Sequence, residues 1–177
     1  MRRKDREITD PALIADVIKR SDLLHIGFYD EKLKEVYVLP VNFGPVETDR
    51  GWVFYFHGAK AGRKRELIAE NPSVGFEMET RYKMYSDEGV LESDGLAGGQ
   101  MGRDAKMLAC SWATRFESVI GTGTVSVVED REERMKGFAA LMQQVTGRTD
   151  WKYEEAMLKV TRVYKLTVKT LSCKKHD

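Results

Sequence analysis

One apolar run constrains the fold more than any other part of the sequence. Residues 52–57 read WVFYFH, so every residue before the closing histidine is aromatic or β-branched. This composition predicts a pleated strand that is buried on at least one face. Gly58 ends the run, a cluster of cations follows, and Asn71 with Pro72 ends the helix expected after them. The sequence therefore predicts a strand, a tight loop and a helix.

Positive charge gathers where this loop meets the helix. A helix beginning near Ala61 would present free N–H groups and the positive end of its dipole. Lys60, Arg63 and Lys64 are spaced i, i+3 and i+4, so they are expected to share one helix face. A phosphate bound there would relieve the repulsion between like charges. A solvated basic turn is the alternative, and the sequence alone leaves the choice open.

Length and composition exclude several classes of protein. The 177 residues are 42% hydrophobic and 32% charged, which predicts one domain, residues 1–177, with a sizeable core. A net charge of +1 argues against nucleic acid and membranes as partners. The two cysteines, the lack of a signal peptide and the lack of a membrane-length apolar run together predict a cytoplasmic protein. The three histidines are far apart in the sequence, so no metal site is expected.

The remaining periodicities predict more strands than helices. Asp10 and Pro11 form a typical helix start, and residues 11–20 carry an amphipathic stripe. A second helix is expected after Asp130, ending at Gly147, and a short one at 151–157. The apolar stripe of the helix after Asp130 is interpreted as core, and it comprises Met135, Phe138, Leu141, Met142 and Val145. Further strands are expected at 23–29, 35–43, 73–84, 116–128 and 160–171, with a polar tail at 174–177.

Glycine and proline refine this outline. Pro40 places its strand at a sheet edge or at a break in pairing. Gly44-Pro45 and residues 48–51 are expected to turn into the central strand. Gly121 and Gly123 indicate a bulge or a close backbone approach. A glycine-containing stretch at about 85–109 is expected to be a long loop or an insertion.

Tight turns between most strands predict a mainly β protein, an antiparallel barrel with peripheral helices. The sequence has no dinucleotide fingerprint, Walker motif or nucleophile elbow. Three ordered motifs then resemble the flavin-binding split-barrel proteins: LPVNFG at 39–44, YFHGAKAGRK at 55–64 and CSWATRFESVIGTG at 110–123. They are most similar to the 5-nitroimidazole-resistance branch of the pyridoxamine 5′-phosphate oxidase-like superfamily. Gly58 stands where a serine is expected, and the segment after Met84 is longer than usual.

The resemblance implies a homodimer with FMN at the subunit interface. It implies that Arg63 and Lys64, with Lys60 beside them, hold the FMN phosphate. The backbone would line the flavin at Pro40, Val41, Asn42, His57, Gly58 and Ala59. The ring would be covered, or approached from the partner, by Trp112, Arg115 and Ser118. Without the resemblance, Trp112 would be interpreted as a core aromatic.

His57 is a candidate proton donor, because its ordinary pKa suits that role. A histidine bound only by local backbone is an equal alternative, and His25 is assigned to structure. The function implied is an FMN-dependent oxidoreductase that uses a reduced nicotinamide and a small acceptor such as a nitroaromatic. The alternative is a protein that binds a flavin or haem without catalysis. Binding of nucleic acid through residues 60–65 conflicts with the near-neutral net charge.

Overall fold

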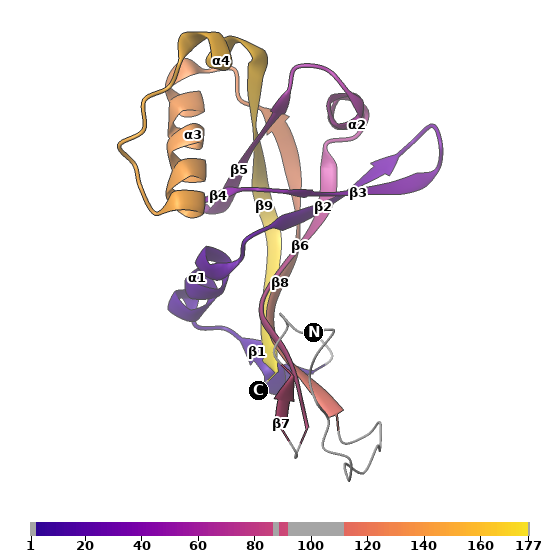
Figure 1. The fold of residues 1–177 in the computed structure, drawn as a ribbon. Coiled ribbons are helices and arrows are strands. Elements are labelled where there is room, and N and C mark those ends of the chain that lie inside the picture. Colours follow the sequence, from indigo (N-terminus) through magenta and orange to yellow (C-terminus); the bar gives the residue numbers. More distant parts are fainter. Residues whose placement is uncertain (1–2, 87–88, 92–111, 177) are drawn as a thin grey trace.

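The computed structural model describes residues 3–86, 89–91 and 112–176. One antiparallel sheet dominates it, with strand order β3-β2-β6-β8-β9-β5-β4 and with β1 beside β9 and β7 beside β6 (Figure 1). The strands are β1 (Glu7–Ile8), β2 (Leu24–Asp30), β3 (Glu35–Val41), β4 (Gly44–Thr48), β5 (Gly51–Ala59), β6 (Ser73–Ser86), β7 (Gly89–Leu91), β8 (Trp112–Val127) and β9 (Thr161–His176). The helices are the 3₁₀ turn η1 (Lys4–Arg6), α1 (Pro11–Arg20), α2 (Arg63–Glu70), α3 (Arg131–Thr146) and α4 (Glu155–Val160). The mainly β architecture with peripheral helices is confirmed.

The central run forms β5 as expected, and its residues alternate between two cores. Phe54 and Phe56 are fully buried in the larger cluster, where Phe54 meets Phe43 and Phe76 edge to face. Tyr55 points the other way, into a small cluster with Val163 and partly buried residues of α3. A strand buried on both faces therefore separates the barrel interior from the face that α3 covers.

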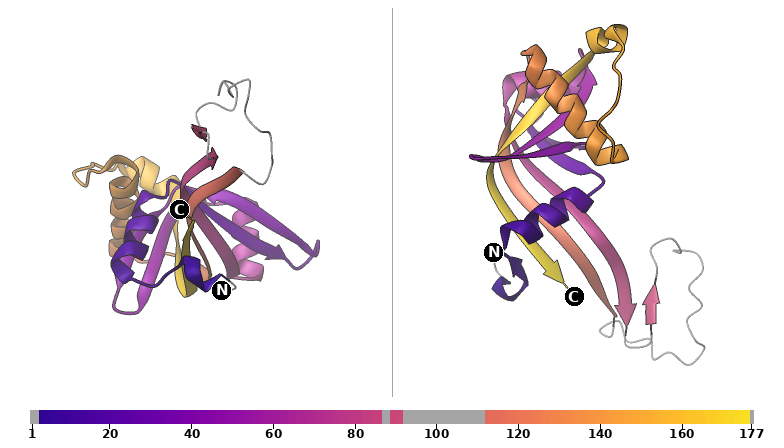
Figure 2. Two further views of the ribbon diagram at one scale, coloured as in Figure 1. Left: turned by 90° about the horizontal axis from the view of Figure 1, so that it is seen from below. Right: turned by 90° about the vertical axis from the view of Figure 1, so that its left-hand side faces the viewer.

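The long strands β6, β8 and β9 curve together along the molecule (Figure 2). Gly121 permits this packing, because a Cβ there would overlap the carbonyl oxygen of Thr170 and the ring of Phe76. The β8–β9 register shifts between Thr122 and Gly123, so the predicted close approach and bulge are both confirmed. α3 and α4 lie together at one end of these strands, and the β2–β3 hairpin projects from the opposite side (Figure 1).

The starts of α1 and α3 and the end of α3 were predicted well. Asp10 accepts a hydrogen bond from the amide of Ala12 at 2.8 Å, and Asp130 caps α3 through the amide of Glu133 at 2.7 Å. Gly147 adopts φ 70° after α3, as a left-handed C-cap requires. Among the described strands β3 pairs with β2 alone, which confirms the edge position that Pro40 predicts.

Several predicted boundaries were wrong. Gly44 and Pro45 belong to strand β4 rather than to a turn, and Gly44 is needed because a Cβ would overlap the backbone of α3. The predicted polar tail continues β9 as far as His176, since its backbone pairs with β8 and β1 whatever the side chains are. α2 begins at Arg63, not near Ala61, and the short helix expected at 151–157 spans Glu155–Val160. Of the loop or insertion expected at about 85–109, residues 85–86 and 89–91 are paired strand in β6 and β7, and residues 87–88 and 92–109 lie outside the described part of the chain.

Candidate functional site

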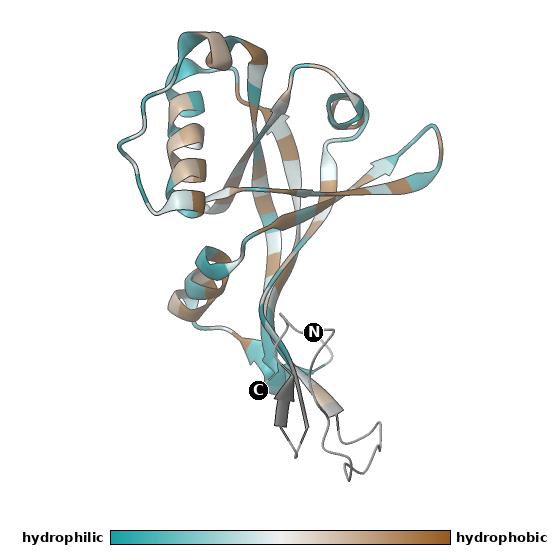
Figure 3. Cartoon of the chain, in the orientation of Figure 1, coloured by the Kyte–Doolittle hydropathy of each residue, from teal (hydrophilic) through white to brown (hydrophobic). Residues whose placement is uncertain are grey.

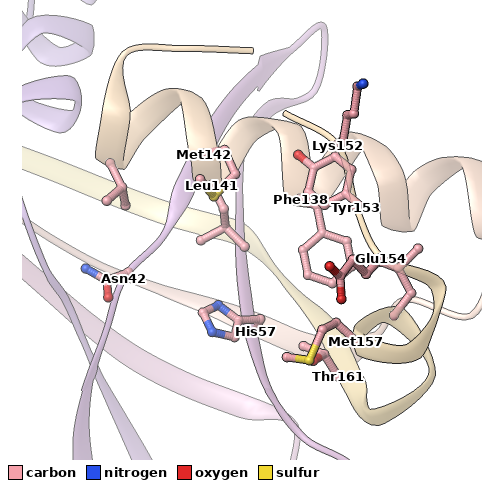
Figure 4. Close-up of a pocket in the computed structure, with 12 residues that line it drawn as sticks. Asn42, His57, Phe138, Leu141, Met142, Lys152, Tyr153, Glu154, Met157 and Thr161 are labelled. Carbon is pink, nitrogen blue, oxygen red and sulfur yellow. The ribbon is translucent and has the colours of Figure 1, made fainter. Parts of the chain in front are cut away.

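Two residues from separate sequence motifs, Asn42 and His57, line one cavity of about 540 Å³ (Figure 4). Asn42 lies just after β3 and His57 lies in β5, while α3, α4 and the segment between them form the opposite wall. The other lining residues are Phe138, Leu141, Met142, Val145, Lys152, Tyr153, Glu154, Met157, Leu158 and Thr161. The volume lies within the range of small-molecule sites, and the wall is mainly apolar with a few polar groups.

The alternation of β5 places His57 in this cavity. Phe56 is buried in the barrel interior, so its neighbour His57 points to the face that carries α3 and α4. Burial lowers the pKa of His57, and the nearby Lys64 ammonium lowers it further. The imidazole is therefore neutral at pH 7 and presents one N–H donor and one acceptor nitrogen to the cavity.

The contribution of α3 to a site was not predicted from the sequence. Its apolar stripe was expected to be core, and that expectation was wrong for part of it. Leu141 is buried, but Val145 is 57% exposed, and Phe138 and Met142 are only partly buried where they line the cavity. A usable signal for this site was the second apolar group just downstream, Tyr153 and Met157. Tyr153 precedes α4 and Met157 lies in it, and both line the cavity with the α3 stripe.

The junction between β5 and α2 differs from its predicted form. Lys60 precedes the helix, so it does not share a helix face with Arg63 and Lys64, and that expectation was wrong. Gly62 is the N-cap with φ 116°, and no described side chain caps the helix there. The amide of Arg65 donates to the carbonyl oxygen of Gly62 at 3.0 Å, and the amides before it have no capping side chain in the described part of the chain.

Both cations of this junction are held by groups of the same chain. Arg63 forms an ion pair with Asp30, whose side chain is only 3% exposed, and a second one with Glu66 at 3.2 Å. Asp30 also accepts hydrogen bonds from the amides of Lys32 and Leu33, which fixes the β2–β3 turn. The buried carboxylate thus joins α2 to the hairpin and orients Arg63.

Lys64 turns back over the end of β5. Its Nζ donates to the carbonyl oxygen of His57 at 3.0 Å and lies 5.3 Å and 5.1 Å from the ring centroids of Phe56 and Tyr164. Burial lowers the pKa of Lys64. A Cβ on Gly58 would overlap the end of the Lys64 side chain, so this glycine leaves the space that Lys64 occupies.

The remaining predicted flavin-binding residues divide into two groups. Pro40 is exposed on the edge strand opposite His25, and Val41 beside it is half-buried, near the cavity that Asn42 enters. Ala59 is exposed at the end of β5 and pairs with Thr161. His25 lies 3.4 Å from Glu77 across the sheet.

The second group lies in β8, far along the sheet. Ser118 is buried with no hydrogen-bond partner within the described part of the chain, and Arg115 is exposed. The side chain of Trp112 lies outside the described residues, although its backbone starts β8. His57 pairs with Val163 of β9 and Ser118 pairs with Lys174, so eleven residues of β9 separate them. At about 3.3 Å per residue, that is roughly 35 Å of strand.

The fold is shared with solved flavin proteins. One similar structure is described as a candidate 5-nitroimidazole antibiotic resistance protein from Bacteroides thetaiotaomicron, with 24% identity, a TM-score of 0.72, and coverage of 96% of this chain and 86% of that one. Another is an FAD- and heme-binding protein from Mycobacterium smegmatis (14% identity, TM-score 0.73, coverage 97% and 74%). A third is the flavocytochrome Anf3 from Azotobacter vinelandii (15% identity, TM-score 0.70, coverage 100% and 72%).

These likenesses define the class by fold: the chain is a split barrel of the kind found in flavin-binding proteins. Within that class, the likeness to the candidate 5-nitroimidazole antibiotic resistance protein is one of fold. No family model and no curated protein matches the sequence. Among the described residues, no helix is long and apolar enough to cross a membrane, and no three metal-ligating side chains cluster.

Proposed function

We propose that this protein binds FMN and acts as an oxidoreductase. The observation that carries the proposal is the cavity that joins Asn42 and His57, one residue from each of two flavin-type motifs, against an apolar and aromatic wall. Bound FMN would supply electron transfer from a reduced nicotinamide to a small acceptor such as a nitroaromatic. The chain's part is to position the ring, exclude water and offer the neutral imidazole of His57 as a hydrogen-bond donor.

The residues at the start of α2 fit the phosphate of FMN. The uncapped amides behind Gly62 suit an anion, and Arg63 and Lys64 lie in the first turn. Asp30 and Glu66 do not exhaust Arg63, because a guanidinium carries five N–H donors. The exposed residues Pro40 and Ala59 remain our proposed lining for the rest of the cofactor.

A homodimer is part of the proposal, because one chain does not bring its two groups of candidate residues together. Ser118 and His57 are separated by roughly 35 Å of strand, so a single flavin can contact both groups only if they come from different subunits. The edge strand β3 also exposes apolar side chains, with Val36 67% and Val38 59% exposed, and hydrophobic bands run along it (Figure 3). Such an edge is suited to burial against a second copy.

The first test is the visible absorption spectrum of the purified protein, followed by release and chromatography of any chromophore. We expect FMN at about one per chain, in a particle whose mass by light scattering is that of a dimer. A protein that takes up no added FMN would overturn the proposal.

Catalysis is tested separately from binding. We expect the holoprotein to oxidise a reduced nicotinamide when a nitroaromatic acceptor is present. Two similar structures are described as a flavocytochrome and as binding heme. A haem spectrum, or bound FMN without turnover, would therefore favour the non-catalytic binding protein.

The phosphate assignment makes a prediction of its own. Replacing Arg63 and Lys64 together by alanine should weaken FMN binding by about 100-fold or more, because two charge-assisted contacts to the phosphate are lost. The matched control is Lys136→Ala with Lys169→Ala, two exposed cations on α3 and β9. FMN affinity measured by fluorescence quenching should not change in the control. Unchanged affinity in the first pair would contradict the assignment.

A further inference from the structure

A second, smaller cavity of about 290 Å³ adjoins the first one and has a different chemistry. Leu158 and Thr161 line both cavities, so the two share a wall. We call the smaller one the basic recess, and its other lining residues are Lys60, Val128, Glu129, Arg134, Lys159 and Arg162. Four of these side chains are cationic and one is acidic, in a chain whose net charge is only +1.

The fold brings these four cations together from the end of β5, the start of α3, the end of α4 and the start of β9. Lys60 follows β5, Arg162 begins β9 opposite Gly58, Arg134 lies in the first turns of α3, and Lys159 lies in the last turn of α4. No short stretch of sequence contains the cluster, so a search for charge runs does not find it. The convergence of strand ends and helix ends creates it.

The hydrogen bonds inside the recess leave donors available. Arg134 donates to the carbonyl oxygens of Leu158 and Thr161, at 2.7 and 3.3 Å, which fixes its guanidinium. Arg162 pairs with Glu129 at 2.9 Å. The Nε of Arg162 is buried, and in the described part of the chain it has no hydrogen-bond partner. A guanidinium carries five N–H donors, so these bonds leave both arginines with donors for an oxyanion in the recess.

We propose that the basic recess binds the phosphate group of an aromatic nucleotide whose ring lies in the adjoining apolar cavity. Arginine pairs present planar donors that match phosphate oxygens, and the shared wall at Leu158 and Thr161 lets one molecule occupy both spaces. The nucleotide is the reduced nicotinamide or the flavin itself. The placement of its ring rests on the proposed function, whereas anion binding in the recess does not.

The first arm of the test needs no flavin. Lys60→Gln with Lys159→Gln removes two exposed recess charges and leaves Arg134 and Arg162 in place. We expect this pair to weaken binding of inorganic pyrophosphate, measured by calorimetry, about tenfold or more. The control pair Lys136→Gln with Lys169→Gln makes the same charge change outside the recess lining and should bind pyrophosphate like the wild type. Equal affinity in all three proteins, or no binding of pyrophosphate, overturns the proposal.

The second arm identifies the nucleotide. The affinities of the Lys60→Gln/Lys159→Gln protein for FMN, riboflavin and NADPH are compared with those of the control pair. Weaker NADPH binding with unchanged FMN binding assigns the recess to the nicotinamide nucleotide. Weaker FMN binding with unchanged riboflavin binding, reproduced by Lys159→Gln alone, assigns it to the flavin, because Lys159 lies in α4 and not at the junction of β5 and α2. If the affinities for FMN and NADPH are both unchanged, the recess is not a nucleotide subsite. This conclusion holds even if the wild-type protein binds FMN and is catalytically active.

Discussion

The two groups of cations in this molecule differ in how their charge is balanced. At the start of α2, Arg63 is paired with Asp30 and Glu66, and Lys64 is bound by a backbone carbonyl and two aromatic rings. In the basic recess, four cations face a single carboxylate and one buried guanidinium nitrogen has no acceptor among the described residues. The group at α2 thus has two carboxylates for its two cations, whereas the recess has one carboxylate for four cations.

The comparison shows why adjacency in sequence is a poor measure of local potential. Neighbouring cations repel one another, so a folded chain tends to supply them with partners from elsewhere, as Asp30 does from β2. Cations from different segments are placed by the topology, and their repulsion remains unless a ligand or solvent screens it. Each of the following predictions alters one side of this contrast.

The largest expected effect comes from removing the internal partner at α2. Asp30→Asn keeps the size of the side chain but deletes the charge that pairs with Arg63, and it weakens the acceptor of the Lys32 and Leu33 amides. We expect the free energy of unfolding to fall by about 3 kcal/mol, the usual cost of breaking a buried ion pair. Urea denaturation measures this directly.

The matched control for that substitution is Asp150→Asn. Asp150 also pairs with an arginine, Arg148, but both side chains are about two-thirds exposed. Its loss should change stability by less than about 1 kcal/mol. If the two variants were equally stable, Asp30 would not be the group that neutralises Arg63.

The same contrast between local and distant contacts separates the features that the sequence predicts from those that it does not. Patterns that act over a few residues were predictive: the apolar run of β5, the caps Asp10 and Asp130, the edge proline Pro40 and the left-handed Gly147. Each depends on local sterics or on one nearby hydrogen bond, so the residues themselves contain the information.

Features made by distant segments were not predictable. The periodicity of the α3 stripe predicts an apolar face, and the stripe was therefore expected to be core. The periodicity does not show that a cavity separates this face from α4. The ion pair of Arg63 with Asp30 joins the start of α2 to the end of β2, and the two residues are 33 positions apart in the sequence. The basic recess requires the ends of β5, α3 and α4 to meet at the start of β9, which only the strand order specifies.

A smaller effect should appear in the pH dependence of stability. Burial and Lys64 lower the pKa of His57 in the folded protein, so below its ordinary value of 6.5 the unfolded chain binds the proton more readily. Stability should therefore fall as the pH decreases from 6.5 towards the folded-state pKa. His57→Gln should lose this contribution, which urea midpoints measured between pH 8 and pH 5 would show as a shallower slope. An identical slope would mean that the ring is freely solvated.

The smallest expected effect compares one lysine from each group. Lys64→Met removes a partly desolvated charge and leaves an apolar chain between Phe56 and Tyr164, so stability should change by less than about 1 kcal/mol. Lys60→Met alters an exposed side chain and should be as mild. Pyrophosphate binding separates the two, because the charge of Lys60 lines the recess and that of Lys64 does not. Only Lys60→Met should weaken it. If Lys64→Met weakened pyrophosphate binding equally, the cations at the start of α2 and those of the basic recess would act as one electrostatic site rather than as two.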